Sequence, residues 1–73
     1  MNEELIMEIV KAISYLDNLR VAYISRIQKR MDILDRNDIK DIVNRLNRIN
    51  FVEKILLEFI LKEVEEALKN EPQ

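Results

Sequence analysis

The chain contains no glycine, and its single proline stands at position 72. Glycine and proline mark most tight turns and strand connections, so their absence from the body of the chain argues against a sheet protein. With 73 residues the chain makes one domain, which we place at residues 1–70, followed by a frayed C-terminal tail at 71–73. The sequence therefore predicts a single all-α domain.

Apolar residues recur at helical spacing from Ile6 to Leu34 without a change of phase. A stripe of this kind is typical of an amphipathic helix. It predicts one long helix over residues 3–34, with Asn2 as its N-cap. The pair Asp17-Asn18 leaves open a local break or kink in this helix.

Two further helix starts follow along the sequence. Asp35, with a second aspartate three residues later, resembles a capping box and predicts a short helix over residues 36–48. Asn50 and Glu53 match the same motif more closely and predict a medium helix over residues 51–69. Because the corners between these segments are short, we expect a three-helix antiparallel arrangement.

The predicted medium helix is apolar around more than half of its girth, which is more than one neighbouring helix can cover. A chain this short buries only about 60% of the surface that its unfolded form exposes. It has neither cysteine nor histidine, so disulfides and the common zinc sites cannot compensate. We therefore expect a homodimeric helical bundle. The candidate self-association residues are Leu57, Leu61, Val64 and Leu68.

Every arginine lies between residues 20 and 48, although the net charge of the chain is −2. Arginine and asparagine read guanine and adenine in the DNA major groove, which makes the basic helix over 36–48 a candidate DNA-binding surface. Interspersed aspartates, a pI near 5.1 and few aromatic residues favour an acidic protein partner instead. Both alternatives use the same candidate contact residues, which are Arg26, Lys29, Arg30, Arg36, Lys40, Asn44, Arg45 and Arg48.

Arg20 lies in the middle of the apolar stripe, between Leu16 and Ile24. A charge at such a position must be paired, reach solvent or meet a ligand. We expect Arg20 to pair with an acidic side chain of a neighbouring helix or to extend to the edge of the bundle. An anion pocket, or a kink that turns Arg20 outward, are the alternatives.

Four aspartates stand at every third residue from Asp32 to Asp41, a spacing that raises the question of a cation site. A corner at Asp35 would send their carboxylates in different directions. Helix capping, and local ion pairs such as Asp41 with Arg45, account for them more simply. We therefore expect no metal ion and no cofactor.

The string LDNLRVAYISRIQKRM includes Arg20 and ends with the triplet Lys29-Arg30-Met31. In these residues, and in the order of a long, a short and a medium helix, the chain resembles the all-helical chorismate mutase family. That resemblance implies an intertwined helical dimer with pockets lined by arginine and lysine. The chain lacks the family's later VAxxK element and the Arg-Glu pair that opens the short helix. The glutamine expected near the end of the last helix is also missing, because Gln73 follows Pro72.

No residues in the sequence pair a nucleophile with a base. We interpret the chain as a non-enzymatic interaction module, an accessory subunit or regulator that acts through protein–protein contacts. A small DNA-binding regulator is the alternative, and a chorismate-mutase-like enzyme is the third interpretation. Apolar runs are far shorter than the roughly 20 residues of a membrane span, and no secretory signal is visible. We therefore expect a cytoplasmic protein without membrane contact.

Overall fold

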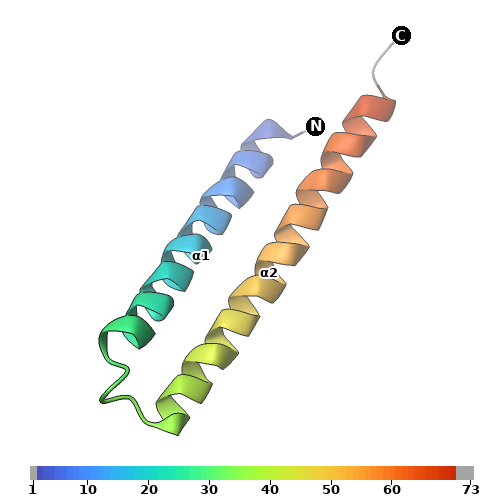
Figure 1. Ribbon diagram of the computed structural model, residues 1–73. Coiled ribbons are helices and arrows are strands. Elements are labelled where there is room, and N and C mark those ends of the chain that lie inside the picture. The colour runs from blue at the N-terminus through green and yellow to red at the C-terminus, as the bar shows by residue number, and fades with distance from the viewer. Residues whose placement is uncertain (1, 71–73) are drawn as a thin grey trace.

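A computed structural model describes residues 2–70 of the chain as two helices and no strand. Helix α1 spans Glu3–Lys29 and helix α2 spans Arg36–Lys69. Figure 1 shows the two helices side by side and antiparallel, with the connecting loop at one end and both termini at the other. The prediction of an all-α protein is confirmed for these residues. The predicted tail at residues 71–73 lies outside the described part of the chain.

The hairpin is long and thin. It measures 60 × 16 × 15 Å, and its radius of gyration is 17.2 Å. A compact chain of this length would have a radius of gyration of roughly 11 Å. Two helices in a single layer leave the outward faces of both without a third element to cover them.

Two predicted N-caps are confirmed. The Asn2 side chain accepts a hydrogen bond of 3.0 Å from the Leu5 backbone N–H. At α2, the Asp35 carboxylate accepts from the Asp38 N–H at 2.8 Å, and the Asp38 carboxylate accepts from the Asp35 N–H at 3.2 Å. These bonds satisfy amide groups that the first helical turn leaves without an intrahelical partner.

Helix α1 is continuous through the Asp17-Asn18 pair, but it ends at Lys29 and not at the predicted Leu34. The axes of packed helices lie about 8–10 Å apart, so an antiparallel chain needs several residues outside the helices to cross that distance. Residues 30–35 provide this connection. Met31 continued the apolar spacing in the sequence, but in the loop its side chain is 69% exposed.

The predicted short and medium helices are one helix, α2, without a corner at Asn50. The three-helix arrangement is therefore wrong, and residues 2–70 form a two-helix hairpin. Asn50 and Glu53 lie inside α2, where there is no helix start to cap, and their side chains accept hydrogen bonds from Arg20 of α1. No described residue has a positive φ, so the left-handed corner that asparagine often supplies is absent from this part of the chain.

The helices meet along an inner seam in which steps of three and four residues alternate. This spacing is the heptad pattern of a coiled coil, in which side chains of one helix pack into holes on the other. On α1 the inner seam consists of Ile6, Ile9, Ile13, Leu16, Arg20, Tyr23 and Ile27, all of them half-buried. On α2 it consists of Ile39, Ile42, Leu46, Ile49, Glu53, Leu56, Ile60, Glu63 and Ala67, the only buried or half-buried residues of that helix.

Candidate functional site

The four predicted self-association residues lie on α2 outside the inner seam, and we call them the outer stripe. The outer stripe consists of Leu57, Leu61, Val64 and Leu68, which are 53%, 57%, 38% and 62% exposed. Steps of four, three and four residues separate them, so they repeat the heptad spacing on another side of α2. The outer stripe thus has the pattern of a second coiled-coil seam, although no helix of the described chain packs against it.

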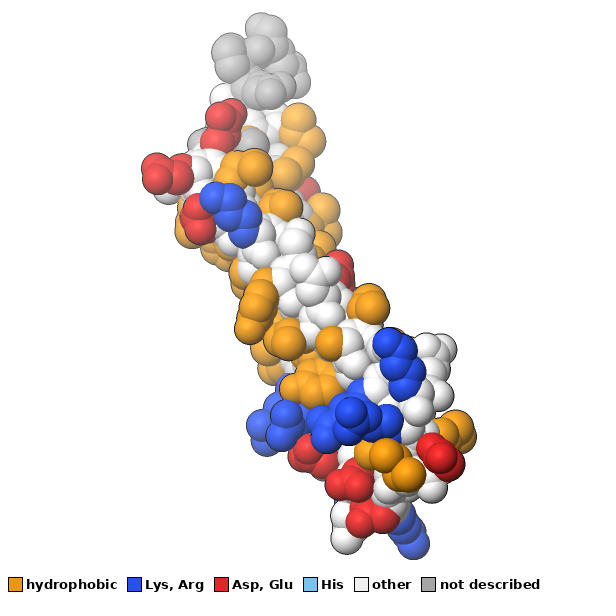
Figure 2. All heavy atoms as spheres, turned by 90° about the vertical axis from the view of Figure 1, so that its left-hand side faces the viewer, with side chains coloured by type: hydrophobic (Ala, Val, Ile, Leu, Met, Phe, Trp, Pro, Cys, Tyr) orange, Lys and Arg blue, Asp and Glu red, His pale blue; other side chains and the backbone are white. Residues whose placement is uncertain are grey.

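Apolar exposure is not confined to the outer stripe. Only two hydrophobic residues of the described chain are buried, Ile42 and Ile49, while large apolar residues on both helices remain exposed. Figure 2 shows apolar side chains along much of the length of one side of the molecule. On a small protein, exposed apolar side chains that are grouped in this way often mark a site of interaction with another molecule.

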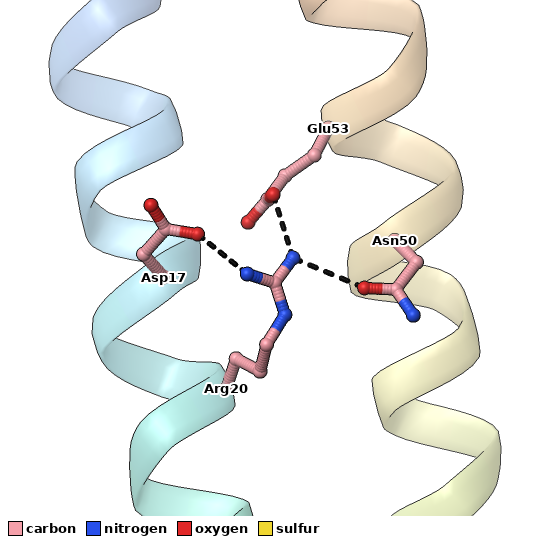
Figure 3. Close-up of polar contacts among 4 residues, drawn as sticks. All are labelled: Asp17, Arg20, Asn50 and Glu53. Atoms are coloured by element: carbon pink, nitrogen blue, oxygen red, sulfur yellow. Dashed lines mark hydrogen bonds and ion pairs between the residues drawn. The ribbon is translucent and has the colours of Figure 1, made fainter.

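A polar cluster interrupts the inner seam halfway along the hairpin (Figure 3). Arg20 of α1 extends between the helices and donates to the Asp17 carboxylate at 2.7 Å. It also donates to the Asn50 side-chain oxygen at 3.0 Å and to Glu53 Oε2 at 2.6 Å, both on α2. The hydrogen bond to Glu53 is the main cause that raises the pKa of Arg20, and the nearby charges of Glu53 and Asp17 add to it. The predicted pairing of Arg20 with an acidic residue of a neighbouring helix is confirmed.

Glu53 is the most buried charged residue of the described chain, with 8% of its surface exposed. Its Oε2 atom is bound by Arg20, but its Oε1 atom is buried and has no hydrogen-bond partner in residues 2–70. Buried polar atoms nearly always have a partner, and a charged one without a partner is costly. Asp17, Arg20 and Glu53 together carry two negative charges and one positive charge. A donor from outside the hairpin would complete this cluster.

A groove of about 330 Å³ opens beside the polar cluster. It is lined by Arg20, Asn50, Glu53, Lys54, Leu57, Glu58 and Leu61. The groove therefore joins the polar cluster to the first two residues of the outer stripe. Its chemistry suits a binding partner with a positively charged or N–H group next to an apolar one.

The basic residues predicted to contact a partner lie near the loop end of the hairpin. Figure 2 shows lysine and arginine side chains grouped there, with acidic side chains directly beside them. Arg26 and Lys29 belong to the last turn of α1, and Arg30 is its C-cap residue. The other five belong to the first half of α2, and they are Arg36, Lys40, Asn44, Arg45 and Arg48. All eight are exposed, so they share one end of the molecule without forming a defined pocket.

Arg45 is held in place by its neighbours. Its side chain pairs with Asp41 at 3.0 Å, as the sequence predicted, and donates to the Tyr23 hydroxyl at 3.0 Å. Its guanidinium carbon also lies 5.7 Å from the centre of the Tyr23 ring. The hydrogen bond to Tyr23 is the main cause that raises the pKa of Arg45, followed by the charge of Asp41. Arg45 is thus partly engaged within the hairpin.

Residues 2–70 contain no group of three or more acidic side chains placed to hold a metal ion. The same residues include no helix with the length and apolar character needed to cross a bilayer. The three-helix order on which the resemblance to chorismate mutases partly rested is also not found, since the described residues form two helices. Arg20, which carried that resemblance, is bound by Asp17, Asn50 and Glu53.

Asn50 and Glu53, predicted to cap a helix, instead accept hydrogen bonds from Arg20 across the hairpin. A signal for the correct role was present, because the steps from Ile49 to Glu53 and from Glu53 to Leu56 keep the heptad spacing. A charged residue at a seam position, on a helix that packs against another seam charge of opposite sign, indicates an interhelical ion pair.

No protein-family model matches the chain, and neither the curated proteins nor the solved structures include one that is similar enough to match it.

Proposed function

We propose that the chain is a non-catalytic helical interaction module, an accessory subunit or regulator that acts through protein–protein contacts and is completed by a second copy of itself. The observation that supports this most is the outer stripe, whose leucines and valine keep coiled-coil spacing while 38% to 62% exposed. Small helical proteins reach stability by oligomerisation when their own core is too small. Ile42 and Ile49 are the only buried hydrophobic residues among residues 2–70, and they make such a small core.

Analytical ultracentrifugation at micromolar concentration tests this proposal. We expect a dimer whose melting temperature rises with protein concentration, because association stabilises the folded state by mass action. Leu61→Glu places a charge on the outer stripe without touching the inner seam, and it should shift the protein to monomer. Ile55→Glu is a matched control, since Ile55 is 51% exposed on another side of α2. A wild-type chain that is a folded monomer, or a Leu61→Glu variant as dimeric as wild type, would contradict the proposal.

The basic loop end supports a second candidate function, contact with DNA. Arg48 and Lys40 are exposed on the first half of α2 and form no ion pair with the described residues. Binding to random duplex DNA at low salt tests it, with Arg45→Ala/Arg48→Ala as the variant and Lys62→Ala as the control. DNA binding should weaken in the double variant and with rising salt, because phosphate contacts release counterions. Binding that responds to neither change would exclude this function.

A further inference from the structure

The residues that line the groove have a regular arrangement on α2. Six of the seven lining residues belong to α2 and fall into two overlapping sets of four, each with the spacing i, i+3, i+4 and i+7. The first set is Asn50, Glu53, Lys54 and Leu57. The second set is Lys54, Leu57, Glu58 and Leu61. Four residues at this spacing form the hole that receives one side chain of a packed helix in a coiled coil. The groove is therefore shaped as two consecutive holes for another helix.

The two holes differ in chemistry. The first is lined by Glu53, whose Oε1 atom is buried and has no partner in the described residues. It calls for a donor that carries positive charge on an apolar stem. The second is lined by Leu57 and Leu61 and calls for an apolar side chain. A matching helix thus presents a lysine or arginine and, three or four residues along, an apolar residue.

Helix α2 itself presents this pair as Lys54 and Leu57, three residues apart. In a parallel pair of identical helices, each seam side chain packs into the hole that surrounds its own counterpart. The residue that enters the hole of Asn50, Glu53, Lys54 and Leu57 is then Lys54 of the other copy. Leu57 of the other copy enters the second hole in the same way.

We infer that the groove receives α2 of a second copy in parallel orientation, with Lys54 of each copy donating to Glu53 Oε1 of the other. The inference rests on the proposed function. It adds the orientation of the two copies and the contact that sets this orientation. Leu61, Val64 and Leu68 then pack against their own counterparts along the outer stripe. The two copies are related by a two-fold axis parallel to their α2 helices.

The charges support this arrangement. None of the ion pairs among the described residues includes Lys54. Adding the partner's Lys54 to Asp17, Arg20 and Glu53 brings the cluster to two positive and two negative charges. Charges buried in a seam persist when they are paired and hydrogen-bonded, and polar seam residues set the register and orientation of coiled coils.

An antiparallel pairing of the outer stripe provides no donor for the Glu53 carboxylate. Such a pairing places Leu57 opposite Leu68 and Leu61 opposite Val64. By the same register Glu53 lies opposite position 72, past the end of α2 at Lys69. The Lys54 side chain of the other copy is then far from the Glu53 carboxylate.

Disulfide formation in single-cysteine variants tests the orientation, because the chain has no cysteine of its own. In the parallel dimer, Leu57→Cys alone should form a covalent dimer rapidly under mild oxidation, and so should Leu68→Cys alone. A mixture of the two variants should give no crossed dimer, because eleven residues of helix separate the positions by roughly 16 Å, beyond the reach of a disulfide. Ile55→Cys, on another side of α2, should stay reduced.

Three other outcomes of the disulfide experiment would contradict the inference, the proposed function or both. If neither single variant forms a covalent dimer and the mixture does, the pairing is antiparallel. That result would overturn the inference and leave the proposed function intact. A dimer in which none of these cysteines joins, or in which Ile55→Cys joins fastest, would exclude the groove as the interface. A monomeric wild-type chain would overturn both the inference and the proposed function.

The contact itself is tested by Lys54→Ala. If Lys54 pairs with Glu53 of the other copy, Lys54→Ala removes two such contacts from the two-fold dimer. It should raise the dimer dissociation constant by on the order of a hundredfold, which is roughly tenfold for each hydrogen bond to a charged group. Lys62→Ala is the control and should change it little. If the two Lys54 side chains merely face each other, they repel, and Lys54→Ala would tighten the dimer. A tighter or unchanged dimer therefore excludes the proposed pairing.

Discussion

The inner seam and the outer stripe use the same heptad spacing on two sides of α2, yet only the inner seam has a partner in the described chain. The inner seam is rich in isoleucine and contains charged residues, including Arg20 and Glu53. The outer stripe is entirely apolar and mostly leucine. Heptad spacing alone predicts only that a helix face packs against another helix. Polar residues within or beside that face specify the partner helix and its orientation.

The largest effect should come from Ile42→Ala in the inner seam, where Ile42 is 2% exposed. Removing most of a buried side chain leaves a cavity and should lower the free energy of unfolding by about 2–5 kcal/mol. Urea denaturation measures this change. The control is Ile33→Ala in the loop, where the side chain is 69% exposed. It should shift the free energy by less than about 0.5 kcal/mol, and equal losses in the two variants would contradict the assigned seam.

The polar cluster should matter more for orientation than for stability. In the double variant Arg20→Leu/Glu53→Leu, apolar side chains replace an ion pair in the seam, and such replacements are often neutral or stabilising. We expect the melting temperature to be maintained. Leu57→Cys alone should still give a covalent dimer, and the mixture of Leu57→Cys with Leu68→Cys should now also give crossed dimers. A double variant that retains the strict selectivity of the parent would show that the cluster does not set the orientation.

A smaller effect should come from Glu63, a half-buried residue of the inner seam that forms no ion pair with the described residues. Glu63→Leu should raise the free energy of unfolding by roughly 1–2 kcal/mol, because it adds apolar burial between the helices. Thermal denaturation measures the gain. Glu65→Leu serves as the control, since Glu65 is exposed and its replacement adds no burial in the seam. Comparable gains at both positions would contradict the seam assignment of Glu63.

The smallest effect should be at the start of α2. Asp35→Ala removes the side chain that accepts from the Asp38 N–H at 2.8 Å. Loss of such a cap typically costs about 1 kcal/mol. Asp32→Ala, in the loop, should cost less and gives the baseline for removing an exposed aspartate there. Chemical denaturation of both variants makes the comparison, and equal costs would argue against a specific role of the cap.

Local signals predicted the all-helical character and the starts of α1 and α2, because capping depends on residues three positions apart. The caps at Asn2 and Asp35 follow from such signals. The ion pairing of Arg20 follows from its place in the apolar stripe, where a charge needs a partner. The predicted corner at Asn50 is wrong because the capping motif there is only local, whereas the heptad spacing of the inner seam continues through it. What Asn50 and Glu53 bind depends on how α1 and α2 are aligned, and their partner Arg20 is 30 and 33 residues away.

The single loop at residues 30–35 also sets an order in which the hairpin can form. Pairing two helix segments close to the loop closes a short stretch of chain, whereas each pairing nearer the termini closes a longer one at greater entropic cost. The helices should therefore join first beside the Asp35 cap and extend past the contact between Arg20 and Glu53. The half of α2 that carries the outer stripe would be the last to meet α1 and the first to separate from it. Hydrogen exchange along α2 should accordingly be slowest near Ile42 and fastest toward Lys69 in a monomer, and a second copy bound along the outer stripe would reverse part of that gradient.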